Sequence, residues 1–181
     1  MNDGTPWLDD DEADAWLALV SVLGVLPAAL DSQLMRDADL TFFEFLVLAQ
    51  LADVEGESIR LSDLAASLNT TLPRLSRVIA QLEKDGLVVR RTSAADARSR
   101  QAHLTDRGRE RLDAAMPGHV ELVQRIFVGP LTREQLGQVR RIGDRLLAGL
   151  DPGRRVLAGS KGPTRDRQGF FRAPIEPRAG V

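Results

Sequence analysis

The sequence predicts a mainly α-helical fold with a small β-hairpin, and two observations over residues 61–105 indicate it. Apolar residues recur at spacings of three and four through 61–68 and again through 75–82, which places them on one face of each of two helices. After Gly86, a residue typical of a left-handed helix cap, the period changes to two, and residues 101–104 offer a return strand. Helix, turn, helix and hairpin in this order predict a winged helix-turn-helix, whose second helix fits the DNA major groove.

Basic charge is concentrated on this segment although the whole chain is slightly acidic. The formal net charge is −2. Residues 1–63 hold 14 acidic and 2 basic residues, a net charge of −12, whereas residues 71–111 hold 10 basic and 5 acidic residues, a net charge of +5. The positive charge therefore lies where the predicted geometry suits DNA, which is the footprint expected of a nucleic-acid-binding surface.

Residues 13–150 resemble the MarR (multiple antibiotic resistance regulator) family of dimeric bacterial repressors. The motifs that carry the resemblance are Leu64-Ala65, Ser76-Arg77, the run from Leu82 to Val88, Asp96-x-Arg98, and Leu104-Thr105-x-x-Gly108. The resemblance implies a homodimeric, sequence-specific transcriptional regulator that binds a pseudo-palindromic DNA operator, a repressor released by a small aromatic or phenolic ligand. Ala97 departs from the family's Asp-Arg-Arg wing, and Leu72 and Pro73 stand where the family favours small polar residues.

The chain divides into three parts on this interpretation. Residues 1–12 form an acidic N-terminal extension, 13–150 the MarR-type domain, and 151–181 a basic tail rich in Pro and Gly that cannot bury a core. Within the domain we expect the winged helix-turn-helix at about 41–105 and the dimerisation helices at about 13–36 and 106–150. Two capping boxes, Thr41 with Glu44 and Thr132 with Gln135, predict helix starts.

The segment Ala15–Leu30 is uncharged throughout and apolar on every side. A membrane span needs about 20 such residues, and this shorter run is interrupted by Ser21, Gly24 and Pro27. We therefore expect a helix covered by its own domain on one face and by a partner subunit on the other, with no membrane contact. The acidic N-terminus does not resemble a signal peptide, which predicts a cytoplasmic protein.

Two further apolar stripes predict the C-terminal helices. The first stripe contains Pro117, which lacks an amide donor and is expected to kink its helix. The stripes consist of Leu112, Met116, Val120, Val123 and Phe127, and of Leu136, Val139, Ile142, Leu146 and Leu150.

The candidate DNA-binding residues lie on the second helix and on the hairpin tip. Thr71 caps the helix, and Thr70, Arg74, Ser76 and Arg77 lie on the side opposite its apolar face, where the alternative to DNA is solvent. In the resembling family the wing arginine, here Arg98, enters the minor groove, and Asp96 can orient its guanidinium; a weak surface ion pair is the alternative. Arg90, Arg91 and Arg100 are expected to contact phosphate or solvent.

The candidate effector site is implied by the family, which binds ligands between the dimerisation helices and the DNA-binding lobe. The residues expected there are Trp16, Val20, Phe42, Phe45 and His119, with His119 as the polar anchor of a mostly apolar site. Ordinary core packing is the alternative for all five. No carboxylate spacing near His119 or His103 resembles a metal site, so neither metal nor cofactor is expected.

An enzyme is not expected, because the chain has no Cys, no Tyr, no phosphate-binding Gly-rich loop and only isolated histidines. The absence of cysteine also excludes disulfides and thiol redox sensing. A winged helix that serves only as a protein-interaction module remains the alternative to a DNA-binding regulator. Such a module need not place arginines on both the second helix and the hairpin tip.

Overall fold

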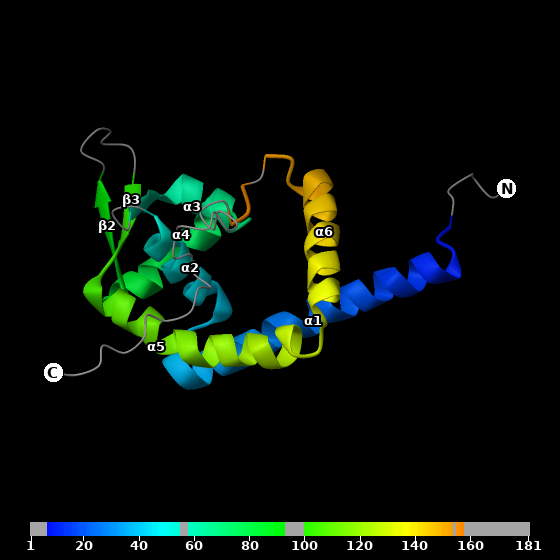
Figure 1. Ribbon diagram of the computed structural model, residues 1–181. Helices are drawn as coiled ribbons and strands as arrows, with labels where there is room; N and C mark the ends of the chain where they lie inside the picture. Colours follow the sequence, from blue (N-terminus) through cyan, green and yellow to red (C-terminus); the bar gives the residue numbers. More distant parts are fainter. Residues whose placement is uncertain (1–6, 55–57, 93–99, 154, 158–181) are drawn as a thin grey trace.

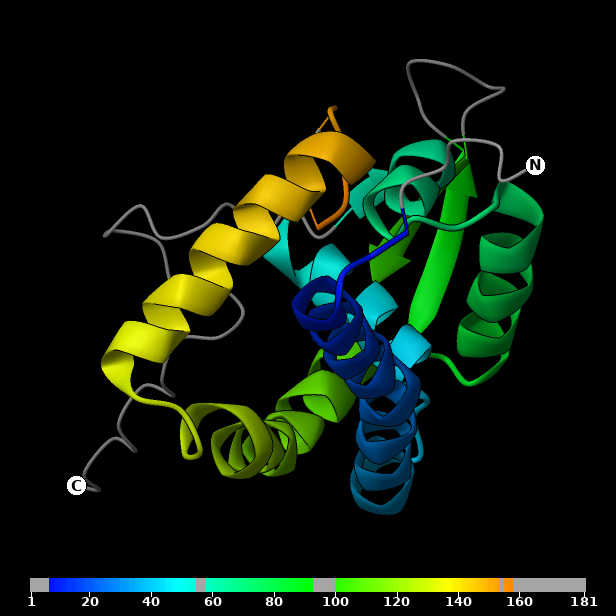
Figure 2. The same ribbon diagram turned by 90° about the vertical axis from the view of Figure 1, so that its right-hand side faces the viewer.

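A computed structural model describes residues 7–54, 58–92, 100–153 and 155–157, and its fold is the predicted one, mainly helical with a small β-hairpin wing. Helices α2 to α4 and the sheet gather at one end of the molecule, and α1 and α5 pack along each other (Figure 1). Helix α6 turns back from the far end of α5 toward the helix-turn-helix in both Figure 1 and Figure 2. The helices α1, α5 and α6 thus form the part of the molecule outside this end.

Helix α1 spans Asp10–Ala38 and extends beyond the predicted helix at both ends. Asp9 caps its N-terminus in a reciprocal pair with Glu12, and Asp39 ends it in a left-handed conformation with φ 51°. Burial begins at Leu30, and the preceding turns are exposed or half-buried. The C-terminal part of α1 therefore belongs to the core of this chain, and the N-terminal part does not.

Among the described helices, α1 is the one long and apolar enough to cross a membrane by length and composition. That test is weak, because a helix covered by protein has the same composition. The side chains that the single chain leaves exposed on it include Trp16, Leu17, Val22, Leu23 and Val25.

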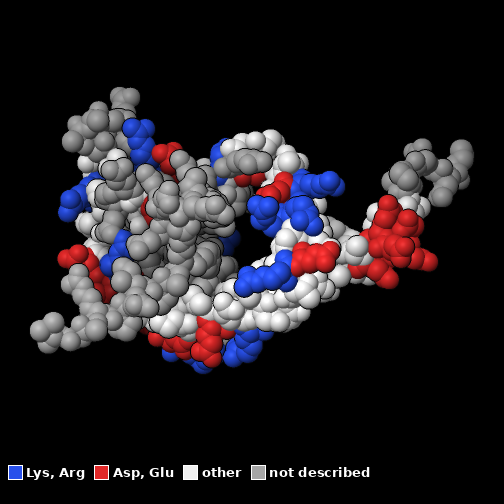
Figure 3. All heavy atoms as spheres, in the orientation of Figure 1, with Lys and Arg blue, Asp and Glu red and all other residues white. Residues whose placement is uncertain are grey.

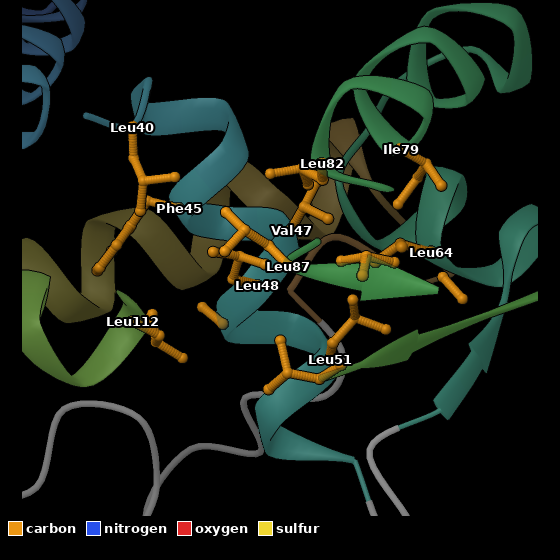
Figure 4. Close-up of a cluster of buried hydrophobic side chains, with 14 of the residues drawn as sticks. Leu40, Phe45, Val47, Leu48, Leu51, Leu64, Ile79, Leu82, Leu87 and Leu112 are labelled. Atoms are coloured by element: carbon orange, nitrogen blue, oxygen red, sulfur yellow. The ribbon is translucent and has the colours of Figure 1, made fainter. Parts of the chain in front are cut away.

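Helix α2 spans Phe42–Asp53 and lies at the centre of the core. The capping box of Thr41 and Glu44 is formed as predicted. Phe45 is fully buried, whereas Phe42 is half-buried at the edge of the core. Figure 4 shows the α2 side chains Phe45, Val47, Leu48 and Leu51 gathered with side chains from other segments. These are Leu64, Ile79 and Leu82 of the helix-turn-helix, Leu112 of α5, Leu40 before α2 and Leu87 before β2.

The helix-turn-helix consists of α3 (Leu61–Ser67) and α4 (Leu72–Lys84). Asn69 in the turn between them has φ 46°, a left-handed conformation that Asn adopts more readily than most residues. Thr71 caps α4 as predicted. Gly86, with φ 74°, is the left-handed glycine expected after the second helix.

The wing is part of a three-stranded antiparallel sheet in the order β1-β3-β2. Strand β2 (Val88–Thr92) and strand β3 (Arg100–Leu104) form the predicted hairpin, with Val89 opposite His103. Strand β1 (Ser58–Arg60) adds a short third strand beside β3. His103 is a strand residue of the wing, in β3.

Helix α5 spans Asp106–Val123 and continues through Pro117 into a π-helical turn, η2 (Gln124–Val128). Its face that is buried within the chain is formed by Gly108, Leu112, Ala115, His119 and Leu122, while Val120 and Phe127 of the predicted apolar stripe are exposed. Helix α6 (Arg133–Leu150) starts at the predicted capping box, and no residue of α6 is buried within the single chain.

The first residues after α6 pack back onto the helix-turn-helix. The Leu157 amide donates a hydrogen bond to the Ser67 carbonyl at the end of α3, over 2.7 Å. The Val156 amide donates to the Asp151 carboxylate over 2.8 Å. This part of the predicted tail thus has a defined contact with the DNA-binding lobe.

Candidate nucleic-acid interface and apolar cavity

The recognition helix α4 separates its apolar and polar residues cleanly. Leu75, Ile79 and Leu82 are buried against the core, which fixes the rotation of the helix about its own axis. On the other side, Arg74 and Arg77 are exposed. Thr71 is also exposed, and Thr70 and Ser76 are half-buried. The five predicted residues therefore lie together on the exposed or half-buried side of the first turns of α4 and of the turn before it.

Arg74 makes a contact that the sequence did not predict. Its guanidinium carbon lies over the Phe43 ring of α2, 5.3 Å from the ring centroid. This distance is within the range of a cation–π interaction. Arg74 is at the first turn of α4, where the helix dipole disfavours a cation, so the aromatic face stabilises it there. The sequence does not indicate this contact, because it depends on how α2 packs against α4.

Arg90, expected to contact phosphate or solvent, instead pairs with Glu83 near the end of α4. The Glu83 carboxylate accepts a hydrogen bond from the Arg90 side-chain Nε over 2.8 Å and another from the Arg90 backbone amide over 3.1 Å. These hydrogen bonds, side chain first, lower the pKa of Glu83 from its ordinary value. The pair joins the recognition helix to the first wing strand.

The wing presents exposed arginines at the outer ends of its strands. Arg91 and Arg100 are exposed on neighbouring strands, near the start of the hairpin tip. Asp96 and Arg98, the predicted minor-groove pair, lie outside the described residues. Figure 3 shows the opposite charge at the far end of the molecule, where acidic side chains cluster on the first turn of α1; they are Asp9, Asp10, Asp11, Glu12 and Asp14.

An apolar cavity of about 550 Å³ lies between α1, α2, α5 and η2. Phe42 and His119, two of the predicted effector residues, line it. Phe45 is fully buried behind the wall, with its ring centroid 4.5 Å from that of His119. Trp16 and Val20 do not line the cavity and are exposed earlier on α1.

Other residues that line the cavity were not predicted from the sequence. They come from later turns of α1 and from segments that reach the cavity only through the tertiary fold. They include Val22, Val25 and Leu26 of α1, Ile126 and Phe127 of η2, and Leu157. Because α1 is apolar all round, its sequence does not indicate which of its turns faces α2.

His119 is the polar residue on the α5 side of this cavity. It is 3% exposed, and burial lowers its pKa from the ordinary value, so its ring is neutral at pH 7. Its ring stacks at 23° on that of Phe42, with centroids 6.4 Å apart. Gln50 is the second polar lining residue. Within the described part of the chain, no three His, Asp or Glu residues are grouped so as to hold a metal.

The fold and its exposed recognition helix define a winged-helix DNA-binding protein of the transcription-regulator class, and comparisons with known proteins agree. The MarR family model matches residues 38–99. The crystal structure of Sco3205 from Streptomyces coelicolor, a MarR family regulator in complex with DNA, is 35% identical with a TM-score of 0.78, over 83% of this chain and 94% of that one. The chain belongs to the MarR family of transcriptional regulators.

Curated relatives support the same assignment. The HTH-type regulator YkoM of Bacillus subtilis (strain 168) is 31% identical over 130 residues, covering 70% of this chain and 83% of YkoM. The transcriptional repressor MprA of Escherichia coli (strain K12) is 31% identical over 107 residues, which is 59% of this chain and 60% of MprA. The match thus spans less than two thirds of MprA. These relatives are regulators of transcription, not enzymes.

Proposed function

We propose that this protein is a homodimeric, sequence-specific repressor that binds a pseudo-palindromic operator and is released from it by a small ligand. The observation that carries the DNA-binding part is the exposed polar surface of α4, with Arg74 and Arg77 beside a buried apolar face. Two such helices in a dimer would enter successive major grooves about 34 Å apart. The proposed domain spans residues 13–150, with the winged helix-turn-helix at about 41–105.

Each residue of this surface has a proposed role. Arg77 reads a base edge, and Arg74, at the first turn of α4, holds a phosphate. Thr70, Thr71 and Ser76 contact the backbone or base edges nearby. On the wing, Arg98 enters the minor groove with Asp96 orienting its guanidinium, and Arg100 contacts phosphate.

The DNA-binding proposal is tested by fluorescence anisotropy with operator fragments selected from a random duplex library. Arg77→Ala should cost about 1–3 kcal/mol of binding free energy if it reads a guanine through two hydrogen bonds. Arg98→Ala should weaken binding while the melting temperature stays unchanged. Affinity for the duplex should fall steeply as salt is raised, because phosphate contacts release counterions.

Arg133→Ala is the matched control, since it removes an exposed arginine from the start of α6, away from the reading surface. Wild-type affinity in both Arg77→Ala and Arg98→Ala would instead favour the alternative, a winged-helix module that contacts a protein partner.

Dimerisation is proposed from the apolar surface that α1 and α6 leave exposed. Ile142 and Leu146 on α6 are 57% and 45% exposed, and Trp16 and Leu23 on α1 are 56% and 59% exposed. Apolar surface of this extent on two helices is typical of an interface between subunits. Covering it with a second copy would place both ends of α1 in contact with protein, in keeping with a cytoplasmic protein that has no membrane contact.

The ligand response is proposed from the cavity beside His119. Two proteins that share the fold with this chain, each less than 25% identical to it, were solved with aromatic compounds. The first is CouR from Rhodococcus jostii RHA1, bound to p-coumaroyl-CoA; it is 24% identical with a TM-score of 0.66, over 77% of this chain and 93% of CouR. The second is the organohalide-sensing regulator RdhR-CbdbA1625, bound to 2,4-dichlorophenol; it is 16% identical with a TM-score of 0.68, over 82% of this chain and 88% of that one. A ligand changes the spacing of the recognition helices only if it binds one spacing more tightly.

Leu157 offers a route from the cavity to the DNA-binding lobe. Its side chain lines the cavity, and its amide is hydrogen-bonded to the Ser67 carbonyl at the end of α3. A ligand that displaces Leu157 would therefore also release a contact to the helix that precedes the recognition helix. No cofactor is part of this proposal.

A further inference from the structure

The described residues that line the cavity beside His119 offer no positive charge to a ligand. Of its described lining residues, twelve are apolar, two are polar, namely Gln50 and His119, and none is charged. His119 does not supply a cation either, because burial lowers its pKa and keeps the ring neutral. A carboxylate that enters an apolar site without a counter-ion loses its hydration without compensation.

The helix end at this cavity is already occupied by the protein's own carboxylates. Phe42, which lines the cavity, is the first residue of α2, and helix N-termini commonly bind anions. Here the Phe42 amide donates to the Asp31 carboxylate over 2.6 Å, and the Thr41 amide donates to the Glu44 carboxylate over 2.8 Å. Both amides are therefore engaged, and the two carboxylates would repel a third negative charge.

The shape of the wall favours a flat ligand. The rings of Phe42 and His119 are stacked within 23° of parallel, and Phe127 lines the same cavity from η2. Aromatic rings at such a site pack well against another planar group. A volume of about 550 Å³ lies in the usual range for small-molecule sites.

We infer that the part of the effector that enters this cavity is uncharged: a planar, mainly apolar molecule with a hydroxyl or carbonyl group that hydrogen-bonds to His119 or Gln50. The inference rests on the proposed effector function of this cavity. It narrows the expectation of an aromatic or phenolic ligand, because it excludes aromatic acids in their ionised form.

The test compares matched pairs of probes that differ in charge and otherwise only by one methyl group. The probes are 4-hydroxybenzoate, 3-phenylpropanoate and 2-naphthoate, each paired with its methyl ester, titrated into the full-length protein by isothermal calorimetry at pH 7. At this pH the carboxylic acids, whose pKa is about 4 to 5, are fully ionised. Within each pair that binds, the ester should bind about tenfold or more tightly than the acid.

A charge placed at the cavity should reverse this preference. Phe127 is 42% exposed, so Phe127→Lys adds a cation at the wall without burying it completely. Its affinity for the acids should rise relative to the esters, whereas the matched control Phe127→Gln should keep the ester preference. Retained melting temperatures in both variants show that the fold persists.

Two results would overturn different statements. Acids that bind the wild-type protein as tightly as their esters would contradict an uncharged ligand while leaving the effector site in place. If none of the six probes binds, the cavity is closed in the assembled protein, for example by a second copy of the chain, and the effector function fails together with this inference.

Discussion

Arg77 and Arg90 have different surroundings in the structure although both are arginines of the same basic segment. Both belong to the basic segment of the sequence, and both were candidates for DNA or solvent contact. In the structure Arg77 is exposed on α4, whereas Arg90 is bound by the Glu83 carboxylate through its side chain and its backbone amide. A guanidinium held in this way is less available to phosphate. The positive charge that remains for DNA is therefore on α4 and on the outer part of the wing.

A pH-dependent stability is expected from His119. Burial lowers its pKa in the folded state, so between that pKa and the unfolded value of about 6.5 the unfolded chain binds more protons. Stability should therefore fall as the pH drops below about 6.5. His119→Phe keeps an aromatic ring against Phe45, and chemical denaturation between pH 8 and pH 5 should show a shallower loss of stability than in the wild type.

His103 provides the comparison for this measurement. Burial, followed by the charge of Arg91, also lowers its pKa, so His103→Gln should flatten the same pH window independently. Parallel curves for wild type and His119→Phe would show that His119 does not titrate differently in the folded state. Glu83 affects stability in a lower pH range. Because its pKa is lowered in the folded state, its ionised form stabilises the fold, and this contribution is lost only below about pH 4.5.

The junction of recognition helix and wing sets the geometry of the DNA-binding surface at the scale of elements. Glu83 on α4 and Arg90 on β2 connect the two across the left-handed turn at Gly86. Gly108 supports the same junction from α5, since a Cβ there would lie 2.1 Å from the Leu87 carbonyl oxygen. The close approach of α5 to Leu87, the residue just before β2, explains why glycine occupies this position.

Glu83→Gln should weaken DNA binding although it removes a negative charge. The exposed ion pair itself contributes only about 0–1 kcal/mol to stability, so the fold should persist with a slightly lower melting temperature. Loss of the link should leave the wing less well oriented toward the minor groove and lower the operator affinity several-fold. Anisotropy titrations at fixed salt measure the change.

Glu110→Gln is the matched control, because it changes the net charge equally at an exposed position of α5. Operator affinity that is unchanged or higher in Glu83→Gln, as simple charge removal predicts, would show that the pair does not orient the wing.

The sequence predicted elements that are specified locally and missed features that depend on packing between elements. The caps at Thr41, Thr71 and Thr132 and the turn at Gly86 were correct, because a few neighbouring residues determine each of them. The sequence did not indicate which side of α5 is buried within the chain, since two adjacent stripes are apolar and only contact with α1 and α2 selects one. The Arg74–Phe43 contact and the turns of α1 that line the cavity were not predicted for the same reason, because both depend on how separate helices pack together.

At the scale of the whole molecule, one chain cannot cover its own apolar surface. The N-terminal turns of α1 and the whole of α6 expose large apolar side chains, whereas the core around α2 is complete within the single chain. The acidic first turn of α1 lies at the end remote from the DNA-binding lobe, as Figure 3 shows. The proposed dimer would use both exposed helices and leave the recognition helices free.

Two truncations should distinguish the parts of the chain that form the dimer. Removing residues 1–36 deletes most of α1, including Leu34, which is fully buried, so the product should aggregate or unfold. Removing 154–181 also breaks the hydrogen bond from Leu157 to Ser67 and uncovers one side of the cavity, but it leaves α1, α5 and α6 intact. Sedimentation equilibrium should therefore give a dimer for the second protein over the same concentration range as the full chain. A folded, monodisperse monomer from the first truncation, or a monomer from the second, would contradict a dimer built on α1 and α6.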